Sequence, residues 1–188
     1  MIYWFKDLPF KPLRDDIWKP VIPYKWLREN FMAAVYILQF VLFALFMLYI
    51  NVYIPKGLDS APVVIRISIP KSLIYLSVIL VWFIHEIIHI AVIFNKGDFS
   101  VTFKNLFFWI NTNAELSKFR YLIFISLPLL VLTAIPFVIS LFMFNNLTYV
   151  LRIYAFYNLI ISPADIINII FILPKPNKAI FYGGMYSI

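Results

Sequence analysis

The chain contains no cysteine, which excludes disulfide bonds, thiolate metal ligands, redox pairs and a cysteine nucleophile. Charged side chains are also scarce, at 13% of the 188 residues, whereas soluble domains carry about 25%. Apolar residues make up 63% of the chain, and the mean hydropathy is +0.89. This composition excludes a water-soluble globular domain, because so large an apolar excess must face lipid as well as a core. The sequence therefore predicts an integral membrane protein.

Four apolar segments are long enough to cross a hydrocarbon core of about 30 Å, which takes roughly 20 helical residues. We expect these spans at residues 31–54, 72–95, 119–144 and 148–173. Lys96 and Gly97 follow the second span, where the glycine would cap the C-terminus of the helix. The predicted fold class is an all-α integral membrane protein with about four transmembrane helices.

Local signals add detail to the third and fourth spans. The run Thr112-Asn113-Ala114-Glu115 has the pattern of a capping box, either for the third span or for a short interfacial turn ahead of it. Three prolines fall inside predicted spans: Pro128, Pro136 and Pro163. We expect each of them to kink its helix rather than break it, because neighbouring helices compensate for the lost hydrogen bond.

The regions outside the spans complete the predicted domain organisation. Residues 1–30 hold four prolines and three tryptophans among six basic residues, which indicates an interfacial cytoplasmic segment with tryptophan at headgroup depth. Residues 31–174 form the predicted four-helix transmembrane domain. Residues 175–188 form a predicted cytoplasmic C-terminal tail.

The basic residues are distributed unequally between the two sides of the predicted membrane domain. Twelve of the 16 lie in the N-terminal segment, the 96–120 loop and the tail, and four lie on the other side. Cytoplasmic loops carry an excess of lysine and arginine, so we expect a multi-pass protein of the cell membrane with both termini in the cytoplasm. This distribution accounts for the net charge of +7 without nucleic acid, and the expected partner is the lipid bilayer.

The only two histidines of the chain stand four residues apart in the second predicted span, as His85-Glu86-Ile87-Ile88-His89. Residues four apart share one face of a helix, so the two imidazoles can converge on one cation. Glu86 lies about 100° around the helix from His85 and can reach a metal-bound water without displacing an imidazole. The alternative is a polar cluster that only joins helices, but serine or glycine would do this at far lower cost in a bilayer.

A catalytic zinc site usually has three protein ligands, and no third histidine exists to complete this one. Asp165 is the leading candidate, because among the nine acidic residues only it and Glu86 lie well inside a predicted span. At 1.5 Å of helical rise per residue, Asp165 also lies about level with the histidines, in the cytoplasmic half of the bilayer. Glu115, as part of the capping box, and Asp98, as a turn residue after Gly97, are the weaker candidates.

Other polar groups lie near the predicted site. Three residues share roughly one helical face with Asp165: Asn158, Ser162 and Asn168. They can hydrogen-bond the aspartate, contact substrate or join neighbouring helices. The segment 99–110, between the second and third spans, is rich in β-forming residues. It predicts either a β-hairpin whose edge pairs with an extended substrate or an aromatic loop that anchors the protein at the interface.

These motifs together resemble a known family. The HExxH run at residues 85–89, followed two spans later by Ser162-Pro163-Ala164-Asp165, is similar to the site-2 protease type of intramembrane zinc metalloprotease. More narrowly, it resembles the small bacterial four-span proteins described as putative zincin peptidases. The resemblance covers about residues 70–175. It implies one zinc ion per chain, bound by His85, His89 and Asp165, with Glu86 activating water.

The predicted function is therefore an intramembrane zinc metalloprotease. It would hydrolyse peptide bonds of a membrane-embedded or membrane-adjacent protein, at a site that opens toward the cytoplasm. The alternative is a non-enzymatic membrane protein that senses, carries or escorts a divalent ion. Two histidines and an aspartate would also accept manganese, iron or cobalt, so the identity of the metal depends partly on the motif.

Overall fold

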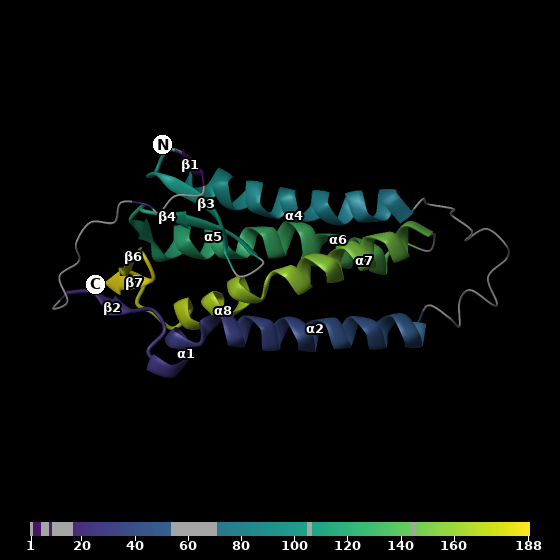
Figure 1. Ribbon diagram of the computed structural model, residues 1–188, viewed down its shortest axis with the longest axis horizontal. Helices are drawn as coiled ribbons and strands as arrows, with labels where there is room; N and C mark the ends of the chain where they lie inside the picture. Colours follow the sequence, from purple (N-terminus) through teal and green to yellow (C-terminus); the bar gives the residue numbers. More distant parts are fainter. Residues whose placement is uncertain (1, 5–7, 9–16, 54–70, 105–106, 144–145) are drawn as a thin grey trace. The chain divides into compact units, whose positions relative to one another are not determined.

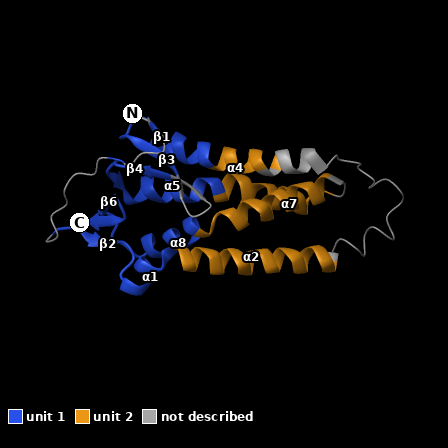
Figure 2. Ribbon diagram, in the orientation of Figure 1, with its two compact units in different colours: residues 1–31, 86–128, 164–188 blue, residues 32–85, 129–163 orange. Residues whose placement is uncertain are grey.

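The computed structural model describes residues 2–4, 8, 17–53, 71–104, 107–143 and 146–188 (Figure 1). The chain divides into two compact units, which Figure 2 shows in different colours. Unit 1 comprises Met1–Phe31, Glu86–Pro128 and Ala164–Ile188, and unit 2 comprises Met32–His85 and Leu129–Pro163.

Helices make up most of the described chain, as the long apolar segments predicted. In chain order they are α1 (Lys25–Glu29), α2 (Phe31–Tyr53), α4 (Lys71–Ile93), α5 (Lys118–Leu129), the π-helical segment η1 (Leu130–Ala134), α6 (Ile135–Leu141), α7 (Asn146–Ile161) and α8 (Pro163–Ile172).

Two helical stretches of the described chain are long and apolar enough to cross a membrane, Phe31–Val52 and Lys118–Leu141. Only 6% of the apolar window of the first is buried inside the protein, so most of its apolar surface needs lipid. Leu147–Ile161 and Pro163–Ile172 qualify only as a pair bent by 66°, and the described apolar part of α4, Ile79–Ile93, is shorter. The protein thus has two candidate spans, or three if the bent pair is one, and the four-span arrangement stays a prediction.

The expected kink at Pro163 is wrong, because the helix breaks there. α7 ends at Ile161, α8 begins at Pro163, and the two are bent by 66°. Proline disfavours the helical conformation of the residue before it, and its own fixed φ suits the first position of a new helix. The hydroxyl of Ser162 donates to the carbonyl of Asn158 at 2.6 Å and so satisfies one of the last carbonyls of α7.

The helical stretch Lys118–Leu141 continues through its two prolines, but it is not a uniform α-helix. Pro128 lies inside α5, and Pro136 lies in the first turn of α6. Between them the helix widens into the π-helical segment η1. Such segments are rare and often occur at functional sites.

Unit 1 also contains strands, so the expectation of an all-α protein is incomplete. One sheet has the order β1-β3-β4, with β1 (Ile2–Trp4) parallel to β3 (Phe99–Lys104) and β3 antiparallel to β4 (Phe107–Thr112). Its register places Ile2 and Thr112 on either side of Phe99. The segment 99–110, for which the sequence left two interpretations open, thus contributes two paired strands, and residues 105–106 between them lie outside the described chain.

The second sheet is antiparallel and has the order β2-β7-β6-β5. Its strands are β2 (Lys19–Pro20), β5 (Leu116–Ser117), β6 (Ile180–Tyr182) and β7 (Met185–Ser187). Gly183 and Gly184 join β6 to β7 with φ values of 53° and 81°. A two-residue hairpin turn requires positive φ at these positions, which glycine adopts without steric cost. The predicted tail therefore pairs with a strand from the N-terminal segment.

The run at 112–115 does not cap the third span, which was one of its two predicted roles. The hydroxyl of Thr112 accepts the N–H of Ala114 at 3.1 Å, which forms a local turn, and α5 begins only at Lys118. Ser117 occupies the N-cap instead, and its hydroxyl lies 3.5 Å from the N–H of Arg120.

The predicted C-cap of the helix before Lys96 is two residues out of place. α4 ends at Ile93, and Asn95 takes the left-handed conformation with φ 62°. Gly97 instead lets the backbone pass close to Asn113 and Ala114, because a Cβ atom there would lie 2.9 Å from Asn113 Oδ1 and 3.0 Å from Ala114.

The core of unit 1 joins the two sheets to α4, α5 and α8. Phe181 lies at its centre with 2% of its surface exposed. Its ring stacks on Tyr121 of α5, with centroids 5.1 Å apart, and on Tyr186 of β7 at 6.1 Å. Unit 2 has its own aromatic cluster, in which Tyr49 of α2 lies 4.9 Å from the Phe156 ring of α7.

We predict that Phe181→Ala lowers the free energy of unfolding by about 3–5 kcal/mol, because it leaves a cavity among packed rings. Thermal unfolding in detergent measures the effect. The matched control is Ile180→Ala on the same strand, whose side chain is 41% exposed and should matter little. Equal destabilisation by the two variants would show that the second sheet does not pack as described.

Candidate metal centre

Helix α4 carries both histidines one turn apart on one face, as the four-residue spacing predicted. His85 is 3% exposed and His89 is 5% exposed. Glu86, the residue after His85, is half-buried on the neighbouring face. Buried polar side chains require hydrogen-bond partners, so the partners of the two imidazoles determine what each ring can do.

His85 is held by a chain of hydrogen bonds within unit 2. Its Nδ1 lies 2.9 Å from Oδ1 of Asn158, whose Nδ2 donates to Thr133 Oγ1 at 2.9 Å. The Thr133 hydroxyl in turn donates to the backbone carbonyl of Ala155 at 3.2 Å. The Ala155 carbonyl can only accept, so the Thr133 hydroxyl donates to it and accepts from Nδ2 of Asn158. Oδ1 of Asn158 therefore faces His85, and Nδ1 of His85 must carry the proton. The Nε2 lone pair of His85 is then the one that can bind a metal.

His89 is held in the same way within unit 1. Its Nδ1 donates to the backbone carbonyl of Phe124 in α5 at 2.7 Å, and the Phe124 ring packs against the imidazole with centroids 4.8 Å apart. This contact fixes the proton on Nδ1. Nε2 of His89 faces Asp165, with Oδ2 at 3.4 Å.

Asp165 lies in the first turn of α8, directly after the break at Ser162. The N-terminus of a helix carries partial positive charge, which stabilises a carboxylate there. The other end of α8 is tied to the start of α5, because Nζ of Lys118 donates to the carbonyl of Leu173 at 2.7 Å and to that of Lys175 at 2.5 Å.

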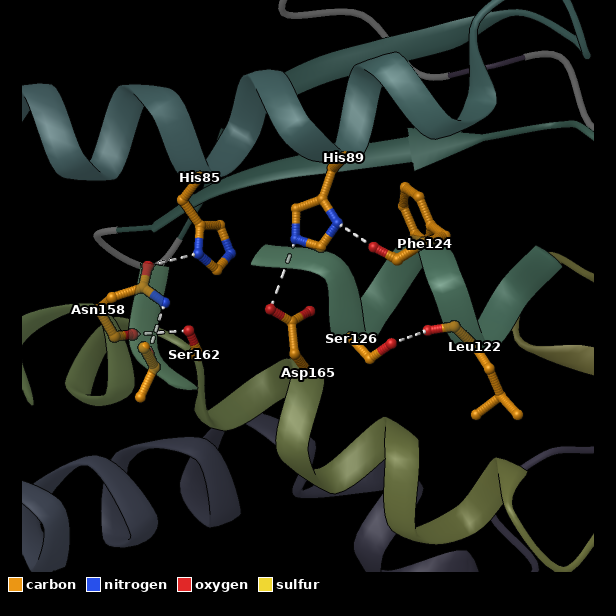
Figure 3. A network of polar contacts seen from close by, with 9 residues as sticks. His85, His89, Leu122, Phe124, Ser126, Asn158, Ser162 and Asp165 are labelled. Carbon is orange, nitrogen blue, oxygen red and sulfur yellow. Dashed lines mark hydrogen bonds and ion pairs between the residues drawn. The ribbon is translucent and has the colours of Figure 1, made fainter. Parts of the chain in front are cut away.

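His85, His89 and Asp165 each offer one ligand atom, and these atoms all lie within 4.8 Å of one another (Figure 3). Two imidazole nitrogens and one carboxylate oxygen are a donor set that catalytic zinc sites use, and three ligands leave the fourth position for water or substrate. Two ligands of a tetrahedral ion with bonds of about 2.0–2.1 Å lie about 3.3 Å apart. The 3.4 Å between His89 Nε2 and Asp165 Oδ2 fits that spacing.

The structure thus brings together the three residues that the sequence predicted as metal ligands. Within the described chain, neither Glu115 nor Asp98 belongs to such a group. The carbonyl of Asp98 accepts the Thr112 hydroxyl at 3.0 Å, beside the strand pair in which Phe99 and Thr112 are partners. Of the polar residues predicted on the face of Asp165, Asn158 holds His85 and Ser162 bonds to Asn158.

Sequence reasoning missed two members of this network, Thr133 and the carbonyl of Phe124. Thr133 is an ordinary polar residue in an apolar span, and no pattern marks it. The Phe124 carbonyl did have a signal, because a proline follows four residues later and cannot donate to it.

Comparison with known families agrees with this geometry. Residues 78–180, more than half of the chain, match the family described as putative zincin peptidase. The chain belongs to this family. The match includes both histidines, Glu86 and Asp165, and membership of a zincin family indicates a metallopeptidase that uses zinc. Searches of the curated proteins and of the solved structures find no match.

For this zincin peptidase family member, we predict that Asp165→Ala reduces bound zinc from about one ion per chain to nearly none, since it removes one of three ligands. Glu115→Ala should leave the zinc content unchanged. Atomic absorption on purified protein measures both. Loss of zinc in Glu115→Ala together with full occupancy in Asp165→Ala would assign the third ligand to Glu115.

Proposed function

We propose that the protein is an intramembrane zinc metallopeptidase of the HExxH type, similar to the site-2 proteases. It hydrolyses a peptide bond of a membrane-embedded or membrane-adjacent protein. The observation that carries this proposal is the convergence of His85, His89 and Asp165 beside Glu86 of the same motif, although 76 residues separate Asp165 from His89. Family membership supports the peptidase activity.

Each residue of the proposed site has a separate role in hydrolysis. His85, His89 and Asp165 would hold the zinc ion, which when bound supplies a Lewis acid that activates water and polarises the scissile carbonyl. Glu86 is the general base that accepts the proton of the attacking water and passes it to the leaving amine. Asn158 and the Phe124 carbonyl keep both imidazoles in the tautomer that presents Nε2.

The membrane setting is proposed from the apolar helices and the basic residues. Candidate spans on either side of the motif support four membrane crossings, with Ile79–Ile93 and the bent pair α7–α8 carrying the ligands. The bias of basic residues supports cytoplasmic termini and a site that opens toward the cytoplasm. A substrate helix must unwind before hydrolysis, and the outer edge of β4 offers backbone groups with which an extended segment can pair.

The alternative function is a metal carrier or sensor that binds an ion with the same three ligands but catalyses no reaction. Glu86 distinguishes the two functions, because a carrier needs the ligands but no general base. Replacement of this one residue therefore separates the proposals.

We predict that Glu86→Gln keeps full zinc content but lowers cleavage by at least about two orders of magnitude, because the amide cannot accept the proton of water. The inactive variant, cross-linked in membranes, captures the substrate, and purified wild-type and variant protein are then compared on that substrate. Glu115→Gln is the matched control and should retain the wild-type rate. Wild-type cleavage by a fully zinc-loaded Glu86→Gln protein would refute the peptidase mechanism.

The proposed topology predicts a labelling pattern for single cysteines, which the native absence of cysteine makes unambiguous. Cysteines replacing Asn105 and Ile188 should react only with reagents that enter the cytoplasm. A cysteine replacing Ser60 should react with a membrane-impermeant maleimide added to intact cells. External labelling at position 105 would overturn both the orientation and the cytoplasmic opening of the site.

A further inference from the structure

Pro128 lies inside α5, one turn after the backbone carbonyl that holds His89. In a regular α-helix the N–H of residue 128 would donate to the carbonyl of Phe124, four residues earlier. Proline has no N–H, so this helical bond cannot form. The Phe124 carbonyl accepts Nδ1–H of His89 at 2.7 Å instead (Figure 3).

We propose that Pro128 is a positioning residue for the metal ligand His89. It removes the helical donor that would compete for the Phe124 carbonyl and thereby assigns that acceptor to the imidazole. The significance of this role for zinc rests on the proposed function, whereas the hydrogen bond itself does not.

Two physical effects of proline act in the same direction. The missing N–H leaves lone-pair capacity on the carbonyl, and the pyrrolidine ring clashes with the carbonyl four residues earlier, which tilts it away from the helix axis. A carbonyl tilted outward can reach a side chain of another helix. Here Phe124 and His89 are both buried, so each group needs a hydrogen-bond partner within the protein.

The consequence is a defined tautomer for His89. With a proton held on Nδ1, Nε2 is the nitrogen that faces Asp165 Oδ2, at 3.4 Å, and the one that can bind a metal. The contact between the Phe124 ring and the imidazole, at 4.8 Å, restricts rotation of the ring. One residue of α5 thus fixes the protonation and the orientation of His89, and Pro128 makes its carbonyl available.

The test uses the fact that the chain has only two histidines. In metal-free protein labelled with ¹⁵N-histidine, NMR reports the tautomer of each ring separately. At a pH at which both rings are neutral, the wild type should carry the proton on Nδ1 of each ring. In Pro128→Ala, the restored N–H competes for the Phe124 carbonyl, so His89 should become a mixture of tautomers. His85 is held by Asn158 and should stay unchanged as an internal control.

A second readout is zinc affinity, measured by competition with a chelating dye. Loss of the hydrogen bond behind a histidine ligand typically weakens metal binding about 10–100-fold, and we expect a loss in this range for Pro128→Ala. Pro136→Ala is the matched control, because it restores an N–H in the same helical stretch but away from the Phe124 carbonyl. It should keep the wild-type tautomers and zinc affinity.

A third variant separates the missing N–H from the ring of proline. Lactic acid incorporated at position 128 forms an ester, which lacks both the N–H and the ring. The proposal requires the ester variant to fold and to keep His89 in the Nδ1–H form. If Pro128→Ala does not fold, the ester variant alone tests the role of Pro128. An Nδ1–H tautomer in folded Pro128→Ala, or its loss in the ester variant, would refute the role of Pro128. Absence of zinc binding in the wild type would refute the proposed function and leave the tautomer result intact.

Discussion

Two hydrogen bonds, from Nδ1 of His85 and Nδ1 of His89, are the interactions on which the metal centre depends. An imidazole held by a proton acceptor on one nitrogen presents a lone pair on the other, and each ring here is held by an oxygen that can only accept. In an apolar helix neither ring can rely on water, so these partners must come from the protein. Asn158 and the backbone of Phe124 provide them.

Three departures from regular helix geometry lie next to the candidate metal centre. The π-helical segment η1 carries Thr133, which orients Asn158. Pro128 leaves a carbonyl available to His89, and the break before Pro163 places Asp165 in the first turn of a new helix. Each irregularity interrupts the regular hydrogen bonding or the straight axis of a helix. In return, a hydrogen-bonding group or a candidate metal ligand lies at the site. The polar groups of these apolar helices thus lie together and hydrogen-bond one another around the candidate metal centre.

The sequence grouped the three candidate ligands, but it did not predict most of the residues that hold them. The spacing of His85 and His89 and the depth of Asp165 follow from the fixed rise and period of a helix, so these three could be grouped without a structure. The hydrogen bond to Phe124 uses a backbone atom, and its only signal in the sequence is the proline four residues later. Short strands in 1–30 and 175–188 were missed because two or three residues give no periodicity, although a Gly-Gly turn was readable. The pattern at 112–115 does not cap the third span because the Thr112 hydroxyl bonds locally after a strand.

The central claim is that two imidazoles and one carboxylate of this chain bind a single zinc ion, and X-ray absorption at the zinc edge of the purified protein tests it most directly. The outer-shell scattering of histidine rings counts the imidazoles, and the first shell separates nitrogen and oxygen from heavier ligands. We predict two imidazoles and additional oxygen ligands at about 2.0–2.2 Å, with one zinc per chain. A spectrum with one imidazole or none, or with only oxygen ligands, would contradict the assignment of His85, His89 and Asp165 as the metal centre.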